Sequence, residues 1–128
     1  MKIKFLLILA ITAFTLHAAL AAPQEIPKGS KLRAQLFDLA RLTIEKQAGK
    51  AVKFAGSQRR LGEWAFFIGQ IVNAKGGPIY VYDSPETLLL WKQVNGTWTF
   101  LTGEAGANEP FHLWEWPAKY GAPKELFE

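Results

Sequence analysis

Two stretches of this chain are apolar on both faces of the strand that each would form, and this feature constrains the fold most strongly. In residues 63–72, apolar side chains occupy both sets of alternate positions: Trp64, Phe66, Ile68 and Val72 on one, and Ala65, Phe67 and Ile71 on the other. Residues 87–94 repeat the pattern, with Leu88 and Leu90 against Leu89 and Trp91. A sheet with one face in water alternates apolar and polar residues. The sequence therefore predicts an antiparallel sheet that is covered on both faces.

One helix is expected ahead of these strands. Ser30 is a favourable N-cap, and Gly49 stands where a left-handed residue commonly ends a helix. Between them, the helical repeat places one set of residues on the side expected to face the sheet: Leu32, Leu36, Leu39, Ala40, Thr43, Ile44 and Gln47. Asp38, Arg41 and Glu45 fall on the opposite side, at spacings that suit surface ion pairs.

Four strands are expected after the helix. They comprise residues 52–57 or beyond, 63–72, 87–94 and 97–102, with 79–82 as a short edge piece. Asn95-Gly96 favours a type I′ hairpin between the last two strands, because both central residues of that turn need a positive φ. The helix would cover only one face of this sheet, so another segment must cover the second face.

The C-terminal segment is the candidate for that cover. It combines many apolar side chains with helix-breaking prolines: Pro110, Phe111, Leu113, Trp114, Trp116, Pro117, Tyr120, Pro123, Leu126 and Phe127. We expect a short helical turn followed by an extended clasp. One interpretation is a lid that completes the core, and the other is an aromatic binding surface, because Trp and Tyr dominate interface hot spots. The expected fold is α+β, with one N-terminal helix packed on a curled four-stranded antiparallel meander and an aromatic-rich C-terminal clasp.

The N-terminus has the anatomy of a secretory signal. Lys2 and Lys4 precede an apolar run over residues 5–20, which is shorter than the roughly 20 apolar residues of a transmembrane helix. Small residues before the junction of Ala21 and Ala22 favour cleavage there. We therefore expect a soluble periplasmic or secreted protein without stable membrane insertion after cleavage. An uncleaved anchor is the alternative.

The predicted organisation is a signal peptide over residues 1–21, a flexible leader over 22–29 and a single α+β domain over 30–128. The chain has no Cys, so packing alone must stabilise it. Its formal charge of +4 includes the two lysines of the signal, and the remaining basic residues are scattered. Nucleic-acid binding needs a basic stripe on one face, so we expect no nucleic-acid partner.

Residues that could carry catalysis are few. Without Cys there is no thiol nucleophile and no Cys-based metal site. His112 is the one histidine outside the expected signal, and no Ser lies in a nucleophile-elbow context. Asp83 and Glu86 bracket a turn and supply too few ligands for calcium. We therefore expect no enzyme activity, no catalytic residue, no metal and no cofactor.

The order of the motifs carries a resemblance. The motifs are the helix over residues 32–41, Gly62-Glu63-Trp64-Ala65-Phe66, the hairpin over 89–98 and the ending over 116–127. They are similar to a group of small exported bacterial proteins of unassigned function, and the fold resembles cystatin-like and nuclear-transport-factor-2-like shapes. The resemblance implies no catalytic residue. The first hairpin connection, residues 57–62, contains one Gln and matches the Gln-rich loop of cystatin-type inhibitors poorly.

These observations favour a non-enzymatic binding module that recognises a protein or a cell-envelope partner. The residues expected to be most exposed for this role are Arg59, Arg60, Tyr80, Tyr82, His112, Trp114 and Trp116. One alternative is a small-ligand pocket between helix and sheet, with or without weak enzymatic activity, lined by Trp64, Phe66, Trp98 or Phe100. Another is an inhibitor or immunity protein that acts against a secreted hydrolase.

Overall fold

The computed structural model describes residues 22–128. The expected signal peptide over 1–21, including Ala21 of the expected cleavage junction, lies outside the described residues. In chain order the elements are β1 (Gln24–Glu25), α2 (Lys31–Ala48), β2 (Lys53–Leu61), β3 (Trp64–Val72), β4 (Glu86–Val94), β5 (Thr97–Ala105), α3 (Phe111–Tyr120) and η1 (Lys124–Phe127). Over 22–128, no helix is both long and apolar enough to span a membrane.

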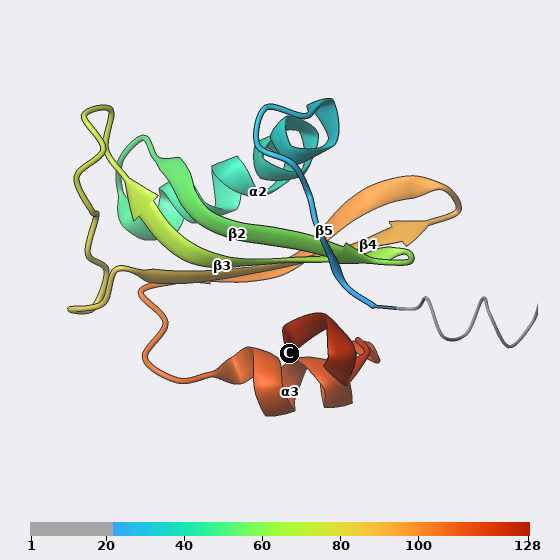
Figure 1. Cartoon of the computed structure of the whole chain (residues 1–128). Coiled ribbons are helices and arrows are strands. Elements are labelled where there is room, and N and C mark those ends of the chain that lie inside the picture. The colour runs from blue at the N-terminus through green and yellow to red at the C-terminus, as the bar shows by residue number, and fades with distance from the viewer. Residues whose placement is uncertain (1–21) are drawn as a thin grey trace, which may run out of the picture.

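The strands form one antiparallel sheet in the order β1-β2-β3-β4-β5. Helix α2 lies on one side of this sheet, and α3 with η1 lies on the other (Figure 1). The prediction of an α+β fold with a helix packed on an antiparallel sheet is confirmed. The prediction of four strands is wrong, because the described sheet has five.

The additional strand, β1, falls within the segment expected to be a leader. Gln24 and Glu25 pair with Arg60 and Arg59 of β2. The Glu25 carboxylate also accepts hydrogen bonds from Ser57 Oγ at 2.8 Å and from the backbone N–H of Gln58 at 3.1 Å. A strand of two residues is too short to show the alternation by which strands are recognised in a sequence. The sequence therefore did not reveal β1, which is defined by its contacts with β2.

Helix α2 has the predicted ends. Ser30 Oγ accepts a hydrogen bond from the backbone N–H of Arg33 at 3.2 Å, and the N–H of Gly49 donates to the carbonyl of Glu45 at 2.8 Å. Its buried side differs from the expected one. Leu39 is 42% exposed, whereas Phe37 is only 7% exposed.

The physical reason is an aromatic contact from the sheet. The ring of Phe37 stacks on Phe54 at 4.6 Å and meets the edge of Phe67 at 5.2 Å. These rings, on β2 and β3, orient α2 so that a neighbouring set of its residues is buried: Arg33, Leu36, Phe37, Ala40 and Ile44.

The hairpin between β4 and β5 has the predicted turn. Asn95 and Gly96 have φ values of 52° and 78°, which are the positive values that a type I′ turn requires. Residues 79–82 do not form a strand. Their surroundings contain only isolated bridges between Val72 and Pro78 and between Val81 and Ser84.

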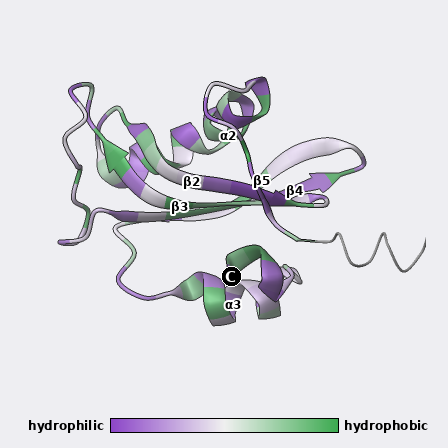
Figure 2. Cartoon of the chain, in the orientation of Figure 1, coloured by the Kyte–Doolittle hydropathy of each residue, from purple (hydrophilic) through white to green (hydrophobic). Residues whose placement is uncertain are grey.

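Apolar clusters lie on both faces of the sheet, as the strands with two apolar faces require. The cluster under α2 includes Leu36, Phe37, Ile44, Phe67, Leu89 and Trp91. The cluster on the second face joins the sheet to the C-terminal segment through Trp64, Phe66, Leu88, Leu90, Trp116, Leu126 and Phe127. Hydrophobic and hydrophilic residues occur together on α2 and on the C-terminal segment (Figure 2). Each of these elements therefore has apolar residues for the sheet and polar residues for solvent.

Candidate functional site

His112 and Trp116 are part of the core, so the expectation that they are exposed is wrong. Both are buried on the second face of the sheet. The imidazole of His112 stacks on Phe66 at 5.3 Å, and Trp116 meets the same ring edge-on at 6.3 Å. Trp116 follows His112 by four positions along α3, so both point to the same side of the helix. The prediction of a short helical turn followed by an extended clasp is wrong here, because α3 is a helix of 10 residues and η1 is a 3-10 helix.

The environment of His112 favours its neutral form. Burial and, to a lesser extent, the positive charge of Arg59 lower the pKa of His112 from its ordinary value. Its buried Nδ1 has no hydrogen-bond partner within residues 22–128. His112 therefore serves as a packed, uncharged ring between α3 and the sheet near pH 7.

Trp114 lies on the outer side of α3. Its side chain is 52% exposed, beside an equally exposed Leu113. The ring of Phe111 meets it edge-on at 6.4 Å. Trp114 is therefore available for contact, as the sequence predicted.

Arg59 and Arg60 do not form one basic surface. Successive residues of a strand point to opposite faces. The Arg59 guanidinium lies 5.4 Å above the ring of Phe66, and its Nη1 donates to the backbone carbonyl of Glu128. The Arg60 guanidinium lies 5.2 Å above Trp98 on the other face. The adjacent pair therefore covers two different aromatic rings, which argues against a single contact with an acidic partner.

Tyr80 and Tyr82 are brought together on a short turn that we call the tyrosine hairpin, residues 79–84. Their side chains are 62% and 78% exposed. The backbone N–H of Val81 donates to the carbonyl of Ser84 at 2.9 Å, and the N–H of Ser84 donates back at 3.1 Å. These two hydrogen bonds close a turn with only Tyr82 and Asp83 at its tip.

The turn holds Tyr82 in an unfavourable backbone conformation. Tyr82 and Asp83 have φ values of 50° and 66°. For a residue with a bulky side chain, the left-handed region costs about 1–2 kcal/mol, whereas Asp and Asn visit it more readily. Such strain persists only where the surrounding structure imposes it, and it is frequent at binding and catalytic sites.

Three contacts impose the conformation of the tyrosine hairpin. Ile79 is buried, and Val81 packs against the cluster under α2. Ser84 Oγ donates to the carbonyl of Ala107 at 3.0 Å. Gly106 allows the close approach, because a Cβ at this position would lie 1.9 Å from the carbonyl oxygen of Val81. The alternation of inward aliphatic and outward tyrosine residues was visible in the sequence, but the role of Gly106 was not.

A pocket of about 500 Å³ adjoins the tyrosine hairpin, and we call it the acidic pocket. Ser84 of the hairpin lines it, together with the carboxylates Glu86 and Glu109 and the amides Gln70 and Asn108. None of the described residues that line it is basic. The arrangement is suited to a positively charged or hydrogen-bond-donating group.

The ligand cavity expected between helix and sheet, with Trp64, Phe66, Trp98 or Phe100 in its lining, is not among the pockets that the structure describes, although a pocket with other lining residues lies between α2 and β2. Trp64, Phe66 and Trp98 are buried in the packed clusters, and with Phe100 they line neither the acidic pocket nor a second pocket beside α2. Over residues 22–128, no group of three or more His, Asp or Glu side chains is placed to hold a metal ion.

Comparison with known proteins gives no match. No protein-family profile, no curated protein and no solved structure shows significant similarity to this chain. The resemblance to small exported bacterial proteins therefore stays a prediction. The function must be argued from the geometry of the chain itself.

Proposed function

We propose that this chain is a non-enzymatic binding module, exported to the periplasm or the cell exterior, that recognises a protein partner through the tyrosine hairpin. The observation that carries the proposal is the strained, exposed position of Tyr82 at the tip of an anchored turn. A residue that is 78% exposed adds little packing to the folded protein. We therefore attribute the backbone strain at Tyr82 to a binding role, in which the turn holds the tyrosine ring in a fixed, exposed position.

The anchoring of the hairpin favours tight recognition. Tyr has only two side-chain torsions and presents a large amphipathic area, so it loses little conformational entropy on binding. The contacts of Ile79, Ser84 and Gly106 order the backbone before a partner arrives. Preorganisation of this kind reduces the free-energy cost of association.

The acidic pocket indicates the chemistry of the partner. Glu86 and Glu109 line it without a basic neighbour, next to the hairpin. A partner surface that combines an apolar area for Tyr80 and Tyr82 with a Lys or Arg for the pocket would match both features. Complementary charge would raise the association rate and strengthen selectivity.

A site-specific photo-crosslinker tests the proposal in cells that naturally produce the protein. Benzoylphenylalanine replaces Tyr80, and a matched control carries it at Leu42, which is 68% exposed on α2. We expect one discrete crosslinked protein from position 80 and none from position 42. Excess wild-type protein should compete for that product, and the variant Tyr82→Ala should not.

Equal products from positions 80 and 42 would indicate non-specific adhesion, and they would reject the tyrosine hairpin as the recognition surface. Absence of any discrete product from position 80 would have the same consequence. If position 80 gives a discrete product, purification of that product identifies the partner. We expect the Glu86→Lys variant to bind this partner more weakly than the wild-type protein does.

A further inference from the structure

A second pocket, of about 310 Å³, lies between the first half of α2 and the start of β2. Three positively charged side chains line it, Arg33, Arg41 and Lys53, against the single carboxylate of Asp38. We call it the basic pocket. It shares no lining residue with the acidic pocket, so it is independent of the proposed partner site.

Arg33 is held in this pocket without a neutralising partner. Its side chain is buried, and its Nη2 and Nη1 donate to the backbone carbonyls of Gly56 at 2.8 Å and Ile26 at 3.4 Å. Within residues 22–128, it forms no ion pair with a carboxylate. Hydrogen bonds to backbone carbonyls orient a guanidinium but do not neutralise its positive charge. A nearby anion would stabilise such a buried charge.

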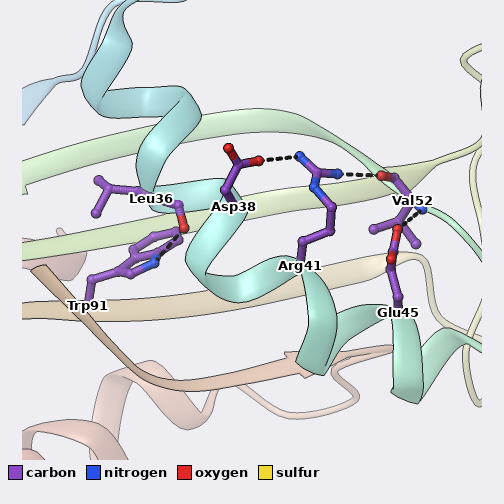
Figure 3. Close-up of polar contacts among 6 residues, drawn as sticks. All are labelled: Leu36, Asp38, Arg41, Glu45, Val52 and Trp91. Carbon is purple, nitrogen blue, oxygen red and sulfur yellow. Dashed lines mark hydrogen bonds and ion pairs between the residues drawn. The ribbon is translucent and has the colours of Figure 1, made fainter.

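Arg41 is also fixed in position. Its Nη1 donates to the carbonyl of Val52 at 2.6 Å, while its Nη2 lies 3.5 Å from Asp38 Oδ1 (Figure 3). The carboxylate of Asp38 is 73% exposed, so water screens this ion pair and little of the charge is cancelled. A guanidinium has five N–H donors, and these contacts leave some of them free.

Aromatic rings position both guanidinium groups. Phe37 and Phe54 stack at 4.6 Å with an angle of 11° between their planes. Arg33 lies 5.1 Å from the centre of the Phe37 ring, and Arg41 lies 5.3 Å from the centre of the Phe54 ring. These contacts stabilise the cations without neutralising them. Phe54 is only half-buried and lines the pocket, so it also supplies apolar surface beside the charges.

From these contacts we infer that the basic pocket binds a small organic oxyanion, a carboxylate or a phosphate monoester, whose anionic group pairs with Arg33, Arg41 and Lys53 and whose apolar part contacts Phe54. Guanidinium groups match both oxyanions through paired N–H donors. The volume is at the small end of the range for ligand pockets, which fits a compact molecule rather than a polymer.

Titration of the purified protein with benzoate, phenyl phosphate and inorganic phosphate tests this inference, with ¹H–¹⁵N NMR as the readout. Benzoate and phenyl phosphate distinguish a carboxylate ligand from a phosphate ligand, and saturable binding of either one supports the site. The shifts should centre on residues around Arg33, Arg41 and Lys53. Inorganic phosphate should bind more weakly than the better organic anion, because it makes no contact with Phe54.

Two variants and one control separate the pocket from general charge effects. Lys53→Gln removes an exposed charge of the pocket, and Arg41→Lys keeps the charge but loses the fork of donors. Each should weaken binding about tenfold, the effect of losing a hydrogen bond to a charged group. Lys46→Gln removes the same charge from the last turn of α2, outside the pocket, and should leave the affinity unchanged.

Three outcomes would overturn the inference. The first is no saturable shift with either organic anion. The second is inorganic phosphate binding as tightly as both of them, which would remove any role for the apolar part. The third is an equal loss of affinity in Lys46→Gln and Lys53→Gln, which would reflect the overall charge of the chain. Because Lys53 is exposed, its variant keeps the test valid even if Arg41→Lys disturbs the contact with Val52.

Discussion

The indole Nε1 of Trp91 in β4 donates a 2.8 Å hydrogen bond to the backbone carbonyl of Leu36 in α2 (Figure 3). Both residues are fully buried. A buried Trp needs a partner for its N–H, and this bond provides it while joining the helix to β4. The hydrogen bond therefore ties the backbone of α2 to a side chain of β4.

Trp91→Phe should lower the free energy of unfolding by about 2 kcal/mol, because it leaves a cavity and removes the hydrogen bond. Urea denaturation followed by circular dichroism measures the change. Trp98→Phe is the matched control on β5, where no hydrogen bond of the indole is found within the described residues, and its effect should be smaller. Equal losses in the two variants would show that the bond to Leu36 contributes little.

Tyr82→Asn should stabilise the protein and weaken partner recognition together. Asn tolerates the left-handed region, so the variant should gain about 1 kcal/mol in thermal or urea unfolding. Tyr80→Asn, made at a position without a positive φ, should give no such gain. The crosslinking assay then reports binding. A Tyr82→Asn protein that is no more stable than wild type would contradict the strain at this position.

Gly106→Ala should displace the tyrosine hairpin. The new Cβ would meet the carbonyl of Val81, so we expect a loss of about 3 kcal/mol in unfolding free energy and altered NMR shifts at Tyr80 and Tyr82. Gly76→Ala is the control, because Gly76 also has a positive φ but open space around it. It should cost only about 1 kcal/mol. Similar losses would mean that backbone strain, and not the contact with Val81, explains the need for glycine.

Acid should destabilise the protein through His112. Its pKa is lowered in the folded state by burial and by Arg59, so the unfolded chain takes up the proton first. The free energy of unfolding therefore falls as the pH drops from about 7 to about 5 and rises again with pH through the same window. His112→Phe should flatten this part of the profile, since it is the one histidine of the described residues. An unchanged profile in the variant would assign the effect to other groups.

Phe127→Ala should destabilise the fold by about 3 kcal/mol. Phe127 is buried in the second cluster, where its ring meets Phe66 at 4.9 Å. Leu113→Ala, on the exposed side of α3, should change stability by less than about 0.5 kcal/mol. Differential scanning calorimetry measures both. A small effect of Phe127→Ala would mean that the C-terminal segment is not needed to cover the second face.

The accuracy of the sequence-based predictions differed between the fold and the candidate site. The apolar pattern of β3 and β4 indicated a sheet covered on both faces. This prediction succeeded because it depends only on which residues alternate along a single strand. Of the site residues, Arg60, Tyr80, Tyr82 and Trp114 are exposed as expected. His112 and Trp116 are not, because their burial depends on the side of α3 that meets Phe66, a residue far away in the chain.

The sequence by itself determined the local features: the N-cap at Ser30 and the turn at Asn95-Gly96. These depend on backbone torsions and on hydrogen bonds between residues a few positions apart. Only the tertiary structure decided that Phe37 rather than Leu39 is buried, and that Tyr82 occupies a left-handed turn against Gly106. Both depend on the shapes of surfaces that meet from distant parts of the chain, and residue patterns along a single segment do not encode that fit.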